Sequence, residues 1–159
     1  MSWARFAADE GRLAEFLRER LHGRVAYLAT IAPGGAPRVH PVTPVIDGRR
    51  LLVFMEPSSP KGRDLQRDSR YALHCGVEDA RGGGGEVLVR GRGVVRPSSD
   101  DAASTGDTPD RPASRYVTFE LSVDDIIVTR AGSEGPRHTR WRAPRSSPPA
   151  DSPGAAPSR

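Results

Sequence analysis

Between residues 24 and 78, apolar runs of strand length follow one another with only short turn signals between them. RVAYLATI (24–31) is rich in β-branched and aromatic side chains, which is typical of a strand. The Gly/Pro cluster APGGAP (32–37) ends that run, and Asp47-Gly48 is a strong two-residue hairpin signal further along. Short turns join antiparallel strands, whereas parallel strands need a long crossover. The spacing therefore argues against a parallel α/β sheet and predicts an antiparallel barrel or sandwich.

Strand patterns continue through the chain and outnumber helical ones. PRVHPVTPVI (37–46) contains three prolines, which cannot donate to a β-ladder, so we expect an edge strand, a bulge or a face turned toward a ligand. Residues 9–21 carry an apolar stripe at helical spacing, and Ser59 followed by Pro60 predicts the start of a short helix. The remaining expected strands are 51–56, 71–78, 87–95, 116–121 and 126–129.

The length of 159 residues suits one domain, which we expect to cover residues 1–142. Residues 97–114 lack apolar periodicity and are predicted to form a long mobile loop. Trp141 is the last large apolar side chain. The Pro/Ser/Ala-rich segment 143–159 that follows is predicted to be disordered.

The pI near 10 suggests a nucleic-acid partner, but the distribution of charge argues against one. Residues 1–136 contain 19 basic and 19 acidic residues, and the whole excess of +4 lies in residues 137–159. The body of the protein therefore has no net attraction for phosphate polymers. No apolar run approaches the ~20 residues of a membrane span, and the N-terminal residues lack a signal-peptide pattern, so we expect a soluble cytoplasmic protein.

Most catalytic and metal-binding motifs are absent from the sequence. There is no Walker loop, no G-x-S-x-G and no H-E-x-x-H, and the GGGG at 82–85 lacks the Lys-Ser/Thr of a phosphate loop. The single Cys75 and the four scattered histidines have no metal-ligand spacing. We therefore expect no metal site.

One arrangement remains, at the start of the helix that follows Ser59. Of the 24 basic residues only Lys61 is a lysine, and it occupies the second position of this helix. Helix N-termini present free amide groups and a positive dipole end, to which Ser58, Ser59 and Lys61 would add hydroxyls and an ammonium. Arg38 has a guanidinium fork suited to a phosphate dianion. The pattern indicates a monophosphate site, with an ordinary capped helix and solvated cations as the alternative.

Residues 25–75 resemble a known family through a series of matching positions. They are similar to the flavin-binding split β-barrel of the pyridoxamine 5'-phosphate oxidase-like family, and FELSVDDIIVTR (119–130) and Trp141-Arg142 resemble its closing strands, though less specifically. The matching positions in the first segment are Leu28-Ala29-Thr30, Pro37, Pro41-Val42, Asp47-Gly48, Ser59, Lys61, Leu65, Asp68, Arg70 and Leu73.

The resemblance implies a mainly β (α+β) fold: a six-stranded antiparallel split β-barrel with an N-terminal helix and a short helix after the third strand. It also implies a homodimer with FMN at the interface between the two copies. Arg38, Ser59 and Lys61 would bind the FMN phosphate. The isoalloxazine ring and ribityl chain would be lined by Val39, His40, Pro41, Val42, Thr43, Phe54 and Met55.

The implied function is that of an FMN-dependent oxidoreductase acting on a small molecule. Residues that bind substrate in the oxidases have no counterpart near the C-terminus, so the substrate stays unassigned. Electron or hydride transfer at a flavin ring needs no acid–base pair from the protein, and the sequence assigns no catalytic residue. The alternatives are a reductase using the 8-hydroxy-5-deazaflavin coenzyme and a non-catalytic flavin- or haem-binding protein. A DNA-associated protein is the remaining class, and the absence of net charge over residues 1–136 argues against it.

Overall fold

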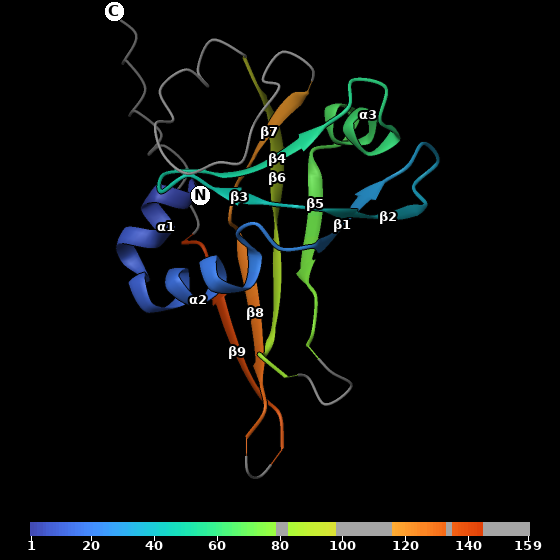
Figure 1. The fold of residues 1–159 in the computed structure, drawn as a ribbon. Coiled ribbons are helices and arrows are strands. Elements are labelled where there is room, and N and C mark those ends of the chain that lie inside the picture. The colour runs from blue at the N-terminus through green and yellow to red at the C-terminus, as the bar shows by residue number, and fades with distance from the viewer. Residues whose placement is uncertain (79–82, 98–115, 133–134, 145–159) are drawn as a thin grey trace, which may run out of the picture.

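The protein is an antiparallel β half-barrel with helices at its ends, described in a computed structural model for residues 1–78, 83–97, 116–132 and 135–144 (Figure 1). Every strand pairing among these residues is antiparallel, as the short turns predict. The helices are α1 (Trp3–Asp9), α2 (Gly11–Leu21) and α3 (Pro60–Arg67). The strands are β1 (Ala26–Ile31), β2 (Pro37–Val42), β3 (Val45–Ile46), β4 (Leu51–Met55), β5 (Arg70–Cys75), β6 (Glu86–Arg96), β7 (Val117–Leu121), β8 (Asp125–Arg130) and β9 (Arg137–Arg142).

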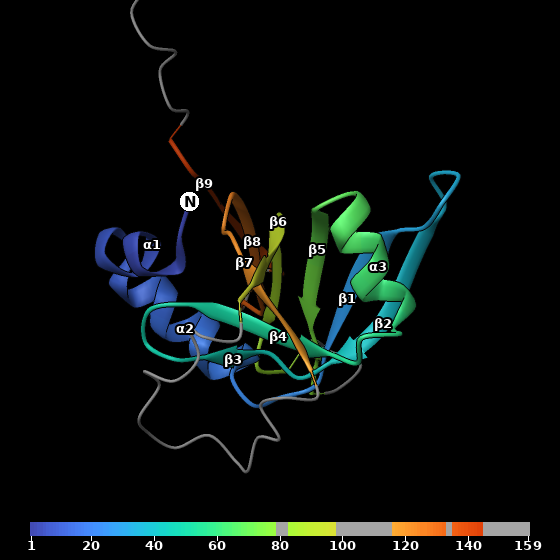
Figure 2. The same cartoon turned by 90° about the horizontal axis from the view of Figure 1, so that it is seen from above.

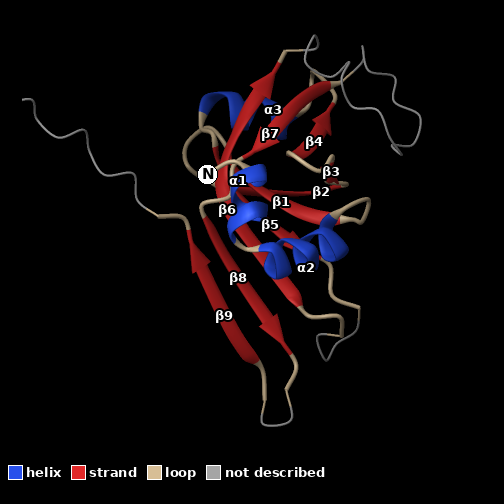
Figure 3. Ribbon diagram, turned by 90° about the vertical axis from the view of Figure 1, so that its left-hand side faces the viewer, coloured by secondary structure: helices blue, strands red, loops and turns tan. Residues whose placement is uncertain are grey.

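The strands follow the order β2-β1-β5-β6-β7-β4-β3, and β8 pairs with β6 and β9. Figure 2 shows these strands curving around an open half-barrel, and Figure 3 shows β8 and β9 projecting from it as a hairpin. The two ends of the order, β2 and β3, are consecutive in the chain and are separated only by Thr43 and Pro44. The proline-rich run therefore lies at the sheet edge, as expected, and it is where the barrel is split.

The described residues contain nine strands, so the expected number of six is wrong. Part of the difference arises because the predicted strand 37–46 is interrupted at Thr43-Pro44, where proline cannot donate to a ladder, and becomes β2 and β3. Another part is β9, whose polar sequence RHTRWR has no alternating pattern. β9 is nevertheless a full partner of β8 along the register from Asp125–Arg142 to Arg130–Arg137.

The N-terminus forms two helices where the sequence predicts one over 9–21. The additional helix, α1, has only seven residues, too few to show a helical period. Its Trp3 and Phe6 are fully buried, and Phe6 makes an edge-to-face contact with Trp141 of β9 at 4.8 Å between ring centroids. Trp141 thus packs β9, the last strand, against α1, the first helix.

Two other predictions lie almost wholly outside the described residues: the mobile loop over 97–114 and the disordered tail over 143–159. In the described ranges, no helix has the length and apolar character needed to cross a bilayer.

The long strand β6 connects the two parts of the sheet. Its first half pairs with β5 and β8, and its second half pairs with β7. Gly91 lies at the change of partner, where a Cβ atom would be only 2.0 Å from the carbonyl oxygen of Ser122. The same oxygen accepts a hydrogen bond of 2.7 Å from the buried Tyr71 hydroxyl. The absence of a side chain at Gly91 thus permits the close approach on which this junction depends.

We predict that Gly91→Ala lowers the free energy of unfolding by about 1–3 kcal/mol, because the added methyl group meets backbone rather than a flexible side chain. Chemical denaturation monitored by circular dichroism measures this change. Gly11→Ala is the matched control, since a Cβ there has nothing within 4 Å, and it should leave stability within a few tenths of a kcal/mol or raise it. Equal stability of Gly91→Ala and wild type would contradict this account of the junction.

Asp125 ties β8 to both of its neighbouring strands. Its carboxylate accepts two hydrogen bonds from the Arg140 guanidinium on β9, at 2.7 and 2.9 Å, and one from Arg90 on β6 at 3.1 Å. The hydrogen bonds from Arg140 lower the pKa of Asp125 below its ordinary value of 3.8, with attraction to Arg90 and Arg142 adding to the effect. Because the folded pKa is lowered, this stabilisation is complete above the unfolded value and disappears as pH falls through the folded one.

We therefore predict that Asp125→Asn has a lower melting temperature than wild type at pH 7, and that the gap narrows as pH falls below the ordinary value of 3.8 and closes once pH has passed the lowered pKa of the folded wild-type carboxylate. Thermal unfolding across a pH series measures the gap. Asp9→Asn serves as control, since its ion pair with Arg5 is long, at 3.9 Å, and exposed. A gap that stays constant down to pH 2 would show that the Asp125 charge is unimportant.

Candidate functional site

The start of α3 carries a serine hydroxyl that no described residue hydrogen-bonds. Ser59 occupies the N-cap position, as predicted, yet its side chain makes no capping hydrogen bond. The residue is only 8% exposed, and its Oγ atom is buried without a hydrogen-bond partner among the described residues. A buried hydroxyl without a partner costs free energy and is normally satisfied by protein, water or ligand. Ser59 Oγ therefore lacks a hydrogen-bond partner that a ligand at this helix end could supply.

Lys61 and the first amides of α3 add positive charge at the same place. Lys61 is partly exposed, and no carboxylate of the described chain lies within ion-pair distance of its ammonium group. The first amide groups of any α-helix lack intrahelical acceptors. Pro60 contributes no N–H, so the amides of Lys61 and Gly62 are the ones that this turn presents. A hydroxyl, an ammonium and backbone amides together form a set of donors suited to a phosphate.

A buried carboxylate brings Arg38 to the side of α3. Asp64, one helical turn after Pro60, is 2% exposed and accepts a hydrogen bond of 3.0 Å from Thr30 Oγ1 on β1. Its Oδ2 atom also lies 3.4 Å from Arg38 Nε on β2, and its Oδ1 atom lies 3.3 Å from Arg67 Nη1. Asp64 thus orients Arg38 toward the helix whose first turn carries Ser59 and Lys61. The sequence analysis did not identify Asp64, because an acid at a buried helix position is recognisable only once its partners are known.

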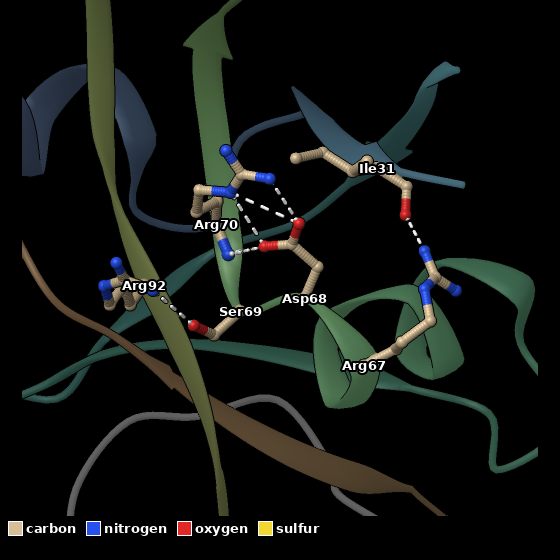
Figure 4. Close-up of polar contacts among 6 residues, drawn as sticks. All are labelled: Ile31, Arg67, Asp68, Ser69, Arg70 and Arg92. Atoms are coloured by element: carbon tan, nitrogen blue, oxygen red, sulfur yellow. Dashed lines mark hydrogen bonds and ion pairs between the residues drawn. The ribbon is translucent and has the colours of Figure 1, made fainter. Parts of the chain in front are cut away.

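The C-terminal end of α3 is fixed to the sheet by a second group of polar contacts (Figure 4). The Arg67 guanidinium donates to the carbonyl oxygen of Ile31 on β1. The Asp68 carboxylate accepts hydrogen bonds from Arg70 Nε and Nη2, which lower its pKa to about 2. Ser69 accepts a hydrogen bond of 3.1 Å from Arg92 on β6. These contacts pair the polar side chains at this end of α3, whereas Ser59 Oγ at the other end has no partner in the described segments.

The five predicted ring contacts on β2 and the residue after it divide between two faces of the strand. Val39, Pro41 and Thr43 are exposed on the outer face, whereas His40 and Val42 lie on the inner face with Arg38. A strand alternates in this way, so no single surface of one copy contains all five. The Nε2 atom of His40 is buried and, like Ser59 Oγ, has no partner in the described part of the chain.

Phe54 and Met55 on β4 also point to opposite faces. Met55 is buried in the core beneath α3, where a Cβ atom on Gly62 would lie 3.6 Å from its Sδ atom. Phe54 is half-buried. Ser59 and Lys61 thus lie at the start of α3, and Arg38 contacts the same helix at Asp64. Met55 lies in the core, apart from the exposed residues of β2.

The outer face of β1 and β2 presents apolar side chains to solvent. Val25, Tyr27 and Val39 are exposed, and Tyr27 is the register partner of Pro41. Adjacent exposed apolar groups of this kind mark a surface for a partner or a ligand. The described residues include no group of three or more His, Cys, Asp or Glu side chains placed to bind a metal ion. The described residues thus offer two separate features: a set of phosphate donors at the start of α3, and an exposed apolar surface on the outer face of β1 and β2.

The sequence matches the model of the family "Pyridoxamine 5'-phosphate oxidase" over residues 10–127, which is well over half of the chain. A comparison of the sequence with curated proteins found no match.

Comparison with solved structures shows the same fold in proteins of different described roles. PhzG from Burkholderia lata 383, in complex with tetrahydrophenazine-1-carboxylic acid, is 15% identical with a TM-score of 0.57, and the alignment covers 87% of this chain and 92% of that one. A heme binding protein from Mycobacterium smegmatis is 19% identical with a TM-score of 0.56, covering 87% of this chain and 56% of that one. An F420 reductase is 19% identical with a TM-score of 0.50, covering 69% and 94%.

These likenesses lie below the identity at which function can be transferred, and they establish the fold. The match over residues 10–127 establishes more, because it spans the half-barrel from α2 to β8 and includes the start of α3. The chain belongs to the pyridoxamine 5'-phosphate oxidase family.

Proposed function

We propose that the protein binds FMN and acts as an FMN-dependent oxidoreductase on a small molecule. The observation that carries this proposal is the buried Ser59 Oγ, in the same helical turn as the ammonium of Lys61, both without a partner among the residues that the structure describes. A phosphate dianion would accept hydrogen bonds from both groups and from the first amides of α3. Arg38 would contribute its guanidinium from β2, where the contact with Asp64 orients it.

The ring would lie against the outer face of β1 and β2 and be enclosed by a second copy of the chain. A flavin needs apolar walls as well as cations, and the exposed Val39 and Pro41 offer them. Burying this face in a homodimer would also remove Val25 and Tyr27 from solvent. Of the predicted ring contacts on this strand, the outer face presents Val39, Pro41 and Thr43, and a second copy would cover the ring from its other side.

FMN, when bound, supplies the electron or hydride transfer, and this chain supplies binding and orientation. The residues at the start of α3 would fix the phosphate end, while the outer face of β2 would determine which side of the ring meets the substrate. A deazaflavin coenzyme is the second candidate, supported by the fold shared with an F420 reductase. That coenzyme also carries a phosphate, so the same α3 residues would meet it. Titration with each coenzyme separates the two, and a haem-type absorbance band would support the non-catalytic alternative.

We predict that Lys61→Ala weakens FMN binding by about tenfold or more, because one charge-assisted contact is worth about 1.5–3 kcal/mol. Quenching of flavin fluorescence during titration measures the dissociation constant. Arg63→Ala is the matched control: it removes one positive charge from an exposed position of the same helix and should leave the dissociation constant unchanged. An unchanged constant for Lys61→Ala would remove Lys61 from the site, and equal weakening by both variants would show only general charge attraction.

We predict further that wild type is a dimer and that Val39→Asp shifts it toward the monomer, since a carboxylate would be buried at the apolar interface. Light scattering after size-exclusion chromatography measures the mass. Val94→Asp is the control on the other part of the sheet, where the valine is 61% exposed compared with 60% for Val39. A monomeric wild type, or a Val39→Asp variant that remains dimeric, would contradict the proposed interface.

A further inference from the structure

A cavity of about 600 Å³ lies between the first turn of α2 and the β8–β9 hairpin, and it has no part in the proposed flavin site. Its lining includes Arg12 and Leu13 from α2, Val128 and Arg130 from β8 and Arg137 from β9. None of the ten predicted cofactor residues lines it. A volume of several hundred cubic ångströms is typical of a small-molecule site.

The charged residues among the described lining of this cavity are all arginines. Arg12, Arg130 and Arg137 line it, and none of the described lining residues is acidic. None of the three guanidinium groups forms an ion pair with any residue that the structure describes. This contrasts with Arg140 and Arg142 on the same hairpin, which both lie within 4 Å of the Asp125 carboxylate. Within the described ranges, the arginines beside the cavity thus lack the counter-charge that Arg140 and Arg142 have.

The register of the hairpin makes this arrangement unfavourable without a ligand. Arg130 and Arg137 are direct cross-strand partners, as are Val128 and Thr139 two residues further along, so all four lie on the same face of the ribbon. Like charges directly opposite one another on adjacent strands destabilise a sheet. Arg130 is also fixed in place, because its guanidinium stacks over the Phe16 ring of α2 at 4.0 Å from the centroid. An anion bound between the guanidinium groups of Arg130 and Arg137 would relieve the repulsion between them.

The uncharged lining residues indicate that the ligand has an apolar part as well as an anionic group. Val128 is buried and Leu13 is half-buried, so the cavity has an apolar wall facing its cationic side. Thr139 adds a hydroxyl to the lining. We propose that this cavity is a second ligand site, which binds a small apolar molecule carrying a phosphate or another dianionic group. The site is independent of the one at the start of α3, and a ligand there would link α2 to the β8–β9 hairpin.

Calorimetric titration of the purified protein with phenyl phosphate tests this proposal. We expect saturable binding that is tighter than the binding of inorganic phosphate, because only the ester also uses the apolar wall. Arg12→Gln and Arg137→Gln should each weaken it about tenfold or more, since each removes a charge-assisted contact. Arg49→Gln is the control: it also lowers the net charge by one, lies on the exposed turn before β4, and should leave binding unchanged.

Several results would overturn the proposal. They are the absence of binding at millimolar phenyl phosphate, equal weakening by all three variants, or binding no tighter than that of inorganic phosphate. Loss of FMN affinity in Arg137→Gln would also overturn it, since the cavity would then belong to the cofactor; we expect that affinity to be unchanged. Amide chemical shifts provide a second measurement on wild type alone. Phenyl phosphate should perturb Val128 and Thr139, and perturbations confined to α3 would place the ligand at the other site.

Discussion

The buried carboxylate of Asp64 is the contact on which the arrangement of the candidate site depends. It joins three elements by accepting a hydrogen bond from Thr30 on β1 and lying close to Arg38 on β2, while it sits on α3 itself. A buried carboxylate is stable only when its charge is paired and hydrogen-bonded, so its partners must stay in place. That requirement holds the helix against the first two strands and so fixes the position of its first turn, in which Ser59 is buried and Lys61 is partly exposed.

The split of the barrel follows from a second local constraint. The two ends of the strand order are joined directly by Thr43 and Pro44, and prolines throughout this run limit its backbone pairing. The edge strand β2 therefore presents an apolar outer surface that no other part of the described chain covers. A second copy of the chain and a flavin ring are both apolar enough to cover it. The cavity beside the β8–β9 hairpin differs from this surface because arginines line it.

The sequence was informative where local patterns determine structure and uninformative where distant partners do. Turn residues and alternating apolar runs located β1, β4, β5, β6, β7 and β8, and Ser59-Pro60 located the start of α3. The seven-residue α1 is stabilised by Trp3 and Phe6 packing in the core near Trp141, and β9 is stabilised by pairing with β8; neither has a periodicity of its own. The partners of Asp64 are recognisable only once its burial is known, and the opposition of Arg130 and Arg137 only once the strand register is known. Lys61 was a candidate from the sequence because it is the single lysine, and its role as a phosphate ligand stays a prediction.

The account depends on one claim, that the first turn of α3 binds the phosphate of a flavin. A crystal structure of the protein with FMN tests it most directly. The account predicts the phosphate oxygens within hydrogen-bond distance of Ser59 Oγ and Lys61 Nζ, with the Arg38 guanidinium beside them. A phosphate bound elsewhere, with the Ser59 hydroxyl still lacking a partner, would contradict it.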